Sequence, residues 1–277
     1  MKIAALQMVS TPDVARNLSA ARRLIAQAAG EGAQLVALPE YFCQLGRNDR
    51  DKLEIAEDLA GAADANRTRS PAAPIQAMLR EAAREHGLWV IGGTLPLRGA
   101  DPQHVRNANL VYAPDGSLAA RYDKMHLFRF DNGKERYDEG RVLEAGSAPL
   151  AVQCAGLRVA LSVCYDLRFP ELYRSLMNPP CDLIAVPSAF TYTTGAAHWE
   201  LLLRARAVEN QAYVIAPAQG GTHENGRRTW GHTMIVDPWG EVLGVLPEGE
   251  GVVVAEVEPA RLAAVRRQLP ALEHRRL

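Results

Sequence analysis

The most regular alternation of apolar and polar residues lies within residues 156–164. Apolar side chains occupy every second position, which predicts a strand with one buried face: Leu157, Val159, Leu161 and Val163. Cys164 comes at the end of this predicted strand, on its less apolar side. Pro170 and Glu171 then open a predicted helix, because proline and a carboxylate both suit a first helical turn. A thiol between a strand and a helix can serve as a nucleophile beside free backbone amides.

The same patterns predict the other elements of the chain. Strands are expected at 2–8, 33–39, 88–97, 181–190, 213–217, 232–237, 242–246 and 251–257, with hairpins over 107–123 and 149–163. Helices are expected at 17–29, 74–86, 170–177, 198–210 and 259–268. Residues 128–144 and 191–197 are expected to be loops, and the tail 269–277 to reach over the surface or a neighbouring subunit. Strands that alternate with helices and also pair as hairpins predict an α/β fold, in one domain over residues 1–277.

Charge and cysteine content narrow the function classes. The 31 lysine and arginine residues nearly cancel the 32 aspartate and glutamate residues, and no run of like charge is long enough to bind nucleic acid. No apolar run approaches the length of a membrane span, and the first residues predict a strand rather than a signal peptide. The four cysteines lack metal-ligand spacing: Cys43, Cys154, Cys164 and Cys181. We therefore expect a cytoplasmic protein with reduced thiols, no metal, and no membrane or nucleic-acid partner.

Three polar residues each follow an apolar run of strand length: Glu40, Lys124 and Cys164. They are separated by 84 residues (124 − 40) and 40 residues (164 − 124), so only the fold could bring them together. The carboxyl ends of strands in an α/β sheet line a shared crevice, where such residues can meet. A carboxylate, an ammonium and a thiol suffice for acyl transfer. Each residue also has a structural alternative, as a helix cap, a solvated surface lysine and a packed core thiol, respectively.

Three blocks around these residues resemble the signature blocks of the nitrilase superfamily, the carbon–nitrogen hydrolases. They are LPEYF at 38–42, YDKMHLF at 122–128 and CYDLRFPELYR at 164–174. The resemblance continues through 187–214 and 230–243, so it covers nearly the whole chain. Within the superfamily, TTGAAHWE at 193–200 and AQGGTHENGR at 218–227 are most similar to the branch of deaminated glutathione amidases. The ω-amidase branch is close behind.

The resemblance implies a four-layer αββα sandwich of two mixed sheets flanked by helices, and a catalytic triad on the three residues named above. It also implies a second carboxylate about fifteen residues after Lys124. Glu139 stands at that spacing (139 − 124 = 15), with Glu135 and Asp138 as nearby competitors. The backbone amide of Tyr165 is expected to stabilise an oxyanion together with the lysine.

The resemblance assigns substrate binding to Arg168, Phe190 and Thr194. A separate physical reason supports Arg168, because a guanidinium forked onto a carboxylate holds an anionic acyl group strongly. The alternative for this arginine is a salt bridge to Asp166 or Glu171. The alternative for the phenylalanine and the threonine is packing alone.

The resulting hypothesis is a thiol amidase that cleaves the C–N bond of a small carboxylate-bearing amide through a Cys164 thioester, without a cofactor. It is expected to form a homodimer or a larger homo-oligomer through the helices at 170–177 and 198–210. Deaminated glutathione amidase activity is the leading expectation. An ω-amidase acting on 2-oxo acid amides, a nitrilase and an N-carbamoyl amino acid hydrolase use the same triad. A non-catalytic assembly partner would be marked by a lost triad residue, and none is lost.

Overall fold

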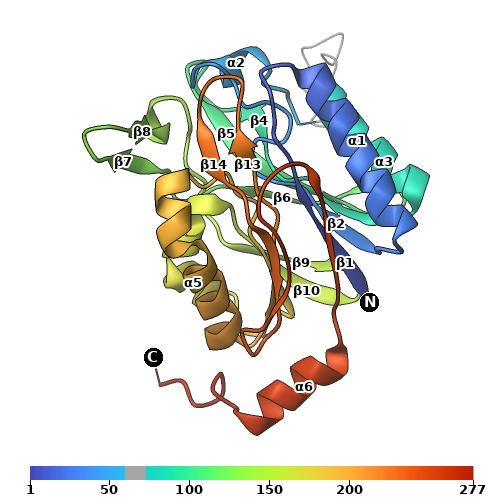
Figure 1. The fold of residues 1–277 in the computed structure, drawn as a ribbon. Coiled ribbons are helices and arrows are strands. Elements are labelled where there is room, and N and C mark those ends of the chain that lie inside the picture. The colour runs from blue at the N-terminus through green and yellow to red at the C-terminus, as the bar shows by residue number, and fades with distance from the viewer. Residues whose placement is uncertain (60–72, 277) are drawn as a thin grey trace.

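The computed structural model describes residues 1–59 and 73–276. Within them, two mixed β-sheets stack face to face and helices cover their outer faces, as Figure 1 shows. The expected order of helix, sheet, sheet and helix layers is therefore confirmed. Two short two-stranded ribbons lie outside the main sheets: β7 (Arg129–Asp131) with β8 (Arg136–Asp138), and β13 (Gly220–Thr222) with β14 (Arg228–Trp230).

Seven strands of the described residues form the first sheet, in the order β17-β1-β2-β3-β5-β4, with β6 beside β5. Their bounds are Lys2–Gln7 (β1), Leu35–Ala37 (β2), Trp89–Ile91 (β3), Leu95–Arg98 (β4), Val105–Tyr112 (β5), Leu118–Asp123 (β6) and Gly251–Glu256 (β17). β1, β2 and β3 are parallel, and the other pairs are antiparallel. Along β1, Ile3 and Ala5 pack with the second sheet, whereas Ala4 and Leu6 pack with helices. Because successive side chains of a strand point to opposite faces of the sheet, the residues of β1 enter the two cores alternately.

The second sheet has six strands among the described residues, in the order β16-β15-β12-β11-β10-β9. Their bounds are Leu150–Cys154 (β9), Leu157–Leu161 (β10), Leu183–Ala185 (β11), Tyr213–Ala216 (β12), Thr233–Val236 (β15) and Val242–Leu246 (β16). β10, β11 and β12 run parallel, and β9 pairs antiparallel with β10 as the predicted hairpin. Ala155 and Gly156 both have positive φ at its turn, 52° and 79°. The central parallel strands are buried, which explains their almost uniformly apolar sequences.

The helices cover each sheet with an apolar stripe. The outer face of the first sheet is covered by α1 (Val14–Gly30) and α3 (Pro74–His86), and that of the second by α4 (Pro170–Ser175) and α5 (Tyr192–Asn210). α3 has the predicted bounds, since Pro74 begins it and Gly87 ends it with a φ of 61°. α6 (Pro259–Gln268) also matches its prediction and lies beyond the sheets at the lower edge of Figure 1. The short α2 spans Asp51–Glu54.

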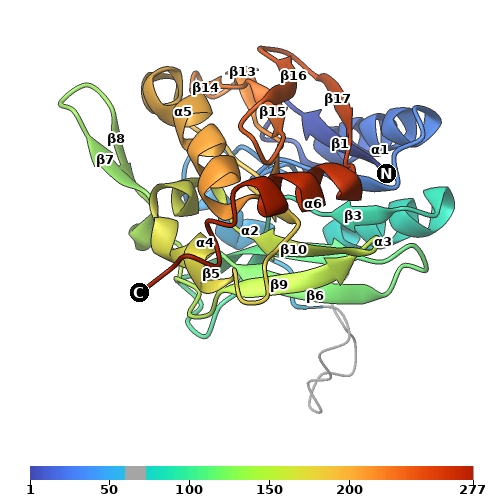
Figure 2. The ribbon, with the colours of Figure 1, turned by 90° about the horizontal axis from the view of Figure 1, so that it is seen from below.

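Two loop predictions were wrong. Residues 192–197 belong to α5, because Thr191 caps the helix by accepting a hydrogen bond from the Thr194 amide at 3.3 Å. The segment 128–144 contains the β7–β8 hairpin and a 3₁₀ helix, with bounds Arg129–Asp131 (β7), Arg136–Asp138 (β8) and Glu139–Arg141 (η1). The hairpin pairs only with itself and projects from the body of the molecule in Figure 2. Its side chains are mostly solvated, so no apolar periodicity marks it.

Other boundaries differ from the prediction in ways that matter for the site. The expected strand over 88–97 is two strands, because the backbone turns at Gly93, with a φ of 59°. β13 (Gly220–Thr222) and β14 (Arg228–Trp230) form an unpredicted ribbon. β10 ends at Leu161, and Cys164 is the first residue of a 3₁₀ helix, η2 (Cys164–Arg168). The tail is described up to residue 276, and residue 277 lies outside the described residues.

Candidate active site

The two sheets deliver the three predicted reactive residues to one point. Glu40 follows β2 and Lys124 follows β6, both strands of the first sheet. Cys164 follows β10 of the second sheet and opens η2. All three are buried, with exposed fractions of 1% for the glutamate and the lysine and 8% for the cysteine. Two of the side chains, those of Glu40 and Cys164, line one pocket.

Lys124 is the centre of the charged network. Its Nζ donates to Glu40 Oε1 at 2.9 Å and to Glu139 Oε1 and Oε2 at 3.0 and 2.8 Å. Burial by itself lowers the pKa of a lysine, but the carboxylates of Glu139 and Glu40 outweigh it and raise the pKa of Lys124 above its usual value. The lysine therefore carries a proton and a full positive charge beside the thiol.

Both oxygens of Glu40 are held in place. Oε1 accepts from Asn107 Nδ2 at 2.9 Å as well as from Lys124, and Oε2 accepts from the Ala189 amide at 3.0 Å. The backbone carbonyl of Glu40 accepts from Gln219 Nε2 at 3.1 Å. These contacts come from both sheets, so the orientation of the carboxylate depends on how the sheets meet.

Glu139, and neither of its two predicted competitors, is the second carboxylate on the lysine. Its Oε1 accepts from the Tyr41 hydroxyl at 2.8 Å, and its Oε2 accepts from the Phe128 amide at 2.7 Å. Burial alone would raise its pKa, but Lys124 and these donors lower the pKa of Glu139. Glu135 instead accepts hydrogen bonds from the hydroxyls of Thr193 and Tyr137. Asp138 forms an ion pair with Arg141, with 3.7 Å between Oδ2 and Nε.

Cys164 occupies a sharp turn with a φ of 49°, which is uncommon for a residue other than glycine. Burial and the negative charge of Glu40 raise the pKa of its thiol, although Lys124 opposes them. The thiol is therefore neutral in the resting protein near pH 7. Tyr165 is the second residue of η2, where the first-turn amides have no intrahelical acceptor. Its backbone N–H lies beside the nucleophile and can donate to an oxyanion.

Asp166, which sequence reasoning considered only as a partner of Arg168, connects the lysine segment to the cysteine turn. Its Oδ2 accepts from the Tyr122 hydroxyl at 2.7 Å and from the Val163 amide at 2.9 Å. Its Oδ1 accepts from the His126 amide at 3.0 Å and lies 2.7 Å from Nδ1 of the same residue. The carboxylate is fully buried, so it fixes the two segments flanking the site relative to each other.

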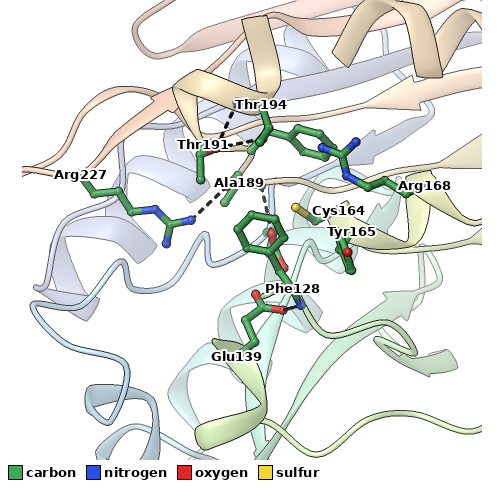
Figure 3. A pocket seen from close by; sticks show the side chains of 11 residues that line it. Phe128, Glu139, Cys164, Tyr165, Arg168, Ala189, Thr191, Thr194 and Arg227 are labelled. Carbon is green, nitrogen blue, oxygen red and sulfur yellow. Dashed lines mark hydrogen bonds between the residues drawn. The ribbon is translucent and has the colours of Figure 1, made fainter. Parts of the chain in front are cut away.

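The pocket at the thiol is drawn in Figure 3. Arg168, Phe190 and Thr194, the predicted substrate residues, all line it. Nη1 of Arg168 lies 3.3 Å from His198 Nδ1, and its Cζ lies 5.5 Å from the centre of the Phe190 ring. Within the described residues it forms no ion pair with Asp166 or with Glu171, so its guanidinium remains available to an anion.

Several contributors to the site were missed by sequence reasoning. Asn107 and Tyr41 hydrogen-bond the two carboxylates, and Arg227 lines the pocket opposite Arg168. Tyr41 follows Glu40 directly and Arg227 ends the block at 218–227. Their positions in these family-like blocks were the sequence evidence that could have assigned them to the site. Asn107 stands out as a polar residue that is nevertheless buried in β5.

Within residues 1–59 and 73–276, no group of three histidine, cysteine, aspartate or glutamate side chains is arranged to hold a metal ion. No helix in the same part of the chain is long and apolar enough to cross a membrane. All four cysteines are free thiols, so Cys164 is not tied in a disulfide.

The similarity to known proteins extends over nearly the whole chain. The family model described as carbon–nitrogen hydrolase matches residues 2–267. The deaminated glutathione amidase of Synechocystis sp. is 41% identical over 277 residues, which covers 98% of this chain and 97% of that protein. The omega-amidase NIT2-A of Xenopus laevis is 37% identical over 276 residues, which covers 99% of this chain and 95% of that protein.

A solved structure agrees with these sequence matches. The crystal structure of the Caenorhabditis elegans NitFhit protein is similar with a TM-score of 0.85 and 37% sequence identity. The match covers 99% of this chain and 65% of that chain. Since both the family model and the fold extend over almost all of its residues, this chain belongs to the carbon–nitrogen hydrolase family of the nitrilase superfamily.

Proposed function

We propose that this chain is a thiol amidase that hydrolyses the amide bond of a small carboxylate-bearing substrate, and that this substrate is deaminated glutathione. The observation that supports it best is the contact of Lys124 Nζ with Glu40 and Glu139 beside a buried thiol, in a pocket also lined by Arg168. The similarity to the deaminated glutathione amidase of Synechocystis supports the substrate.

In the first step, Cys164 Sγ attacks the amide carbonyl carbon while Glu40 takes the thiol proton. A C–S bond forms, and the carbonyl electrons move onto oxygen. The ammonium of Lys124 and the Tyr165 amide stabilise that oxyanion. The intermediate then collapses, the C–N bond breaks, and Glu40 returns its proton to the departing nitrogen, leaving an acyl thioester and a free amine.

In the second step, water attacks the thioester carbon while Glu40 takes a proton from it. The same two donors stabilise the second oxyanion. When the C–S bond breaks, the thiolate leaves and recovers a proton from Glu40, so the thiol is restored and a carboxylic acid is released. One water is consumed for each amide cleaved, and no electrons are exchanged with another molecule.

The charges of the resting site suit this sequence of events. A neutral thiol beside a carboxylate has a base within reach, and the permanent charge of Lys124 is present before any oxyanion forms. We assign Glu139 a positioning role, because its two oxygens contact Nζ of the lysine while Tyr41 and Phe128 hold the carboxylate itself. Arg168 is assigned to the carboxylate of the acyl part, with Phe190 and Thr194 beside it.

A second candidate function is ω-amidase activity on 2-oxo acid amides, supported by the similarity to the Xenopus omega-amidase. The two activities share the acyl part and differ in the leaving group, which is ammonia for an ω-amidase. Nitrilase and N-carbamoyl amino acid hydrolase activities would use the same three reactive residues. An inactive assembly partner is the non-enzymatic alternative.

The test measures product release by the purified protein from four compounds: deaminated glutathione, α-ketoglutaramate, a nitrile and an N-carbamoyl amino acid. We expect the first to give the highest kcat/KM. Cys164→Ala and Cys164→Ser should abolish turnover, whereas Cys154→Ala, which removes a buried thiol outside the site, should keep it. Full activity of Cys164→Ala, or no turnover of any of the four compounds by the wild-type protein, would refute the proposal.

We also propose that the chain acts in the cytoplasm as a homo-oligomer. Leu201 and Val208 lie seven residues apart on α5 and are 68% and 48% exposed, and Trp239 is 54% exposed. Large exposed apolar side chains on one helix face suit a second copy of the chain. Sedimentation of Leu201→Glu/Val208→Glu should give a smaller species than the wild type, while Leu118→Glu, a change at an exposed apolar position on β6 of the first sheet, should not. A monomeric wild-type protein contradicts this proposal.

A further inference from the structure

Arg227 enters the pocket from a loop that is fixed on both sides. The loop joins β13 to β14, and the His223 amide donates to the Arg227 carbonyl at 2.9 Å across it. The imidazole of His223 is buried between the Ser10 carbonyl, at 2.9 Å, and the Thr229 hydroxyl, at 2.8 Å. Asn225 donates to the Gly46 carbonyl at 2.6 Å. The arginine is therefore presented by an ordered turn.

The guanidinium of Arg227 has few partners for its donors. Its Nη2 donates to the Ala189 carbonyl at 3.3 Å, and the group lies 5.0 Å from the centre of the Tyr137 ring. Its Nε is buried and has no hydrogen-bond partner among the described residues. No carboxylate of the described chain forms an ion pair with it, since Glu40 and Glu139 both contact Lys124 instead. A half-buried guanidinium with unpaired donors in a pocket is a site for an anion.

Two features place this arginine on the leaving-group side of the thiol. In Figure 3 the guanidinium groups of Arg168 and Arg227 lie on opposite sides of Cys164. Arg227 contacts Ala189, whose amide donates to Glu40 Oε2 at 3.0 Å. In the proposed reaction Glu40 gives its proton to the departing nitrogen, so the amine part of the substrate extends toward this side of the pocket.

We propose that Arg227 binds a carboxylate on the leaving amine, so that the preferred substrate is a dianion with one carboxylate on each side of the scissile amide. The inference rests on the proposed amidase function and narrows its substrate class. Arg168 holds the acyl carboxylate, and Arg227 holds the second one. An amide whose leaving group is ammonia leaves the donors of Arg227 unpaired, which selects against it. Deaminated glutathione, with the terminal carboxylate of its glycine, belongs to the dianionic class.

The test compares two amides with the same 2-oxo acyl part. In one the leaving amine is a dipeptide with a free terminal carboxylate, and in the other that carboxylate is a neutral carboxamide. We expect Arg227→Gln to lower kcat/KM for the first by about 10- to 100-fold, mainly through KM, and for the second by less than about 3-fold. Arg227→Lys should keep part of the preference, because the charge remains and the forked geometry is lost.

The neighbouring Arg228→Gln is the matched control. Arg228 is exposed, pairs with Glu248 at 2.8 Å and lies over the Tyr192 ring, so neither substrate should be affected. Equal losses for the two amides in Arg227→Gln, or no loss for either, would overturn the assignment.

Binding measured by calorimetry separates this inference from the amidase proposal. In the Cys164→Ala background, which needs no turnover, the carboxylate compound should bind more tightly than the carboxamide, and the added Arg227→Gln change should remove the difference. Equal binding of the two compounds to Cys164→Ala overturns the inference even when the wild-type protein hydrolyses both. A wild-type protein that binds with this preference but hydrolyses neither compound refutes the amidase proposal and keeps the anion site.

Discussion

The Tyr122 hydroxyl donates to Asp166 Oδ2 across 2.7 Å and thereby joins the strand that leads to Lys124 to the turn that begins at Cys164. Tyr122 lies in β6 of the first sheet, Asp166 lies in η2 after β10 of the second sheet, and both side chains are fully or almost fully buried. Since a buried acceptor with several donors is costly to remove, this contact connects the stability of the fold to the geometry of the site.

Replacing the carboxylate should test that connection. Asp166→Ala leaves the Tyr122 hydroxyl and the Val163 and His126 amides without their acceptor, so we expect a loss of about 3 kcal/mol in the free energy of unfolding. Tyr122→Phe removes one of these donors and should cost about 1 kcal/mol. Urea unfolding followed by circular dichroism measures both. Asp131→Ala, at an exposed position, is the control, and a loss for Asp166→Ala no larger than the control's would show that the network does not stabilise the fold.

Glu139→Gln should lower kcat by about 100-fold with little change in KM. The reason is that Glu139 is the largest of the influences that raise the pKa of Lys124 and also fixes the position of its Nζ. Glu135→Gln is the matched control, because this glutamate lies in the β7–β8 hairpin just before η1 but contacts Thr193 and Tyr137 rather than Lys124. Steady-state kinetics of the two variants decide the matter, and similar kcat values for both would remove Glu139 from its positioning role.

The reactivity of the thiol should separate the nucleophile from its base. Burial and Glu40 raise the pKa of Cys164, so Glu40→Gln should lower that pKa and shift the pH profile of iodoacetamide labelling to lower pH. The same variant should lose turnover, because the carboxylate that takes the thiol proton has been removed. Labelling at Cys164 is followed by mass spectrometry, with Cys164→Ala as the blank. Slower labelling of Glu40→Gln at every pH would contradict this account.

Stability should fall in acid partly through Glu139. Its pKa lies below the usual 4.5 because Lys124 and the hydrogen bonds outweigh burial. Folding therefore gains stability from this group above about pH 4.5, and loses it as the pH falls through the lowered pKa and the unfolded chain takes up the proton first. Thermal unfolding between about pH 7 and pH 3 should show a steeper decline for the wild type than for Glu139→Gln. Parallel curves for the two proteins would exclude this contribution.

Local patterns predicted much of the fold because the responsible interactions are local or periodic. Alternation marked the strands, and Pro74 with Gly87 marked both ends of α3. The first turn of α5 was missed because its residues are small and polar. A tertiary contact explains the small residue at Gly195. A Cβ on Gly195 would lie 2.2 Å from the Cβ of Trp230, so only glycine fits where the helix contacts β14.

The site was predicted less evenly. Runs of strand length mark Glu40, Lys124 and Cys164, but the contacts that orient them come from far along the chain. Asn107 meets Glu40 across 67 residues, and Asp166 meets Tyr122 across 44 residues. No local pattern carries such pairings, because each depends on a tertiary arrangement that brings distant segments of the chain together.

Because the two sheets stack face to face, the activity of the protein reports whether they are packed correctly. One layer supplies the base and the cation, and the opposite layer supplies the sulfur, so the chemistry begins only when the two halves are in register. A compact folding intermediate that has all its strands but no fixed packing between the two sheets would not hydrolyse the substrate. Substitutions of apolar side chains packed between the two sheets, such as Ile3 and Val159, should therefore alter the reaction rate although these residues lie outside the pocket.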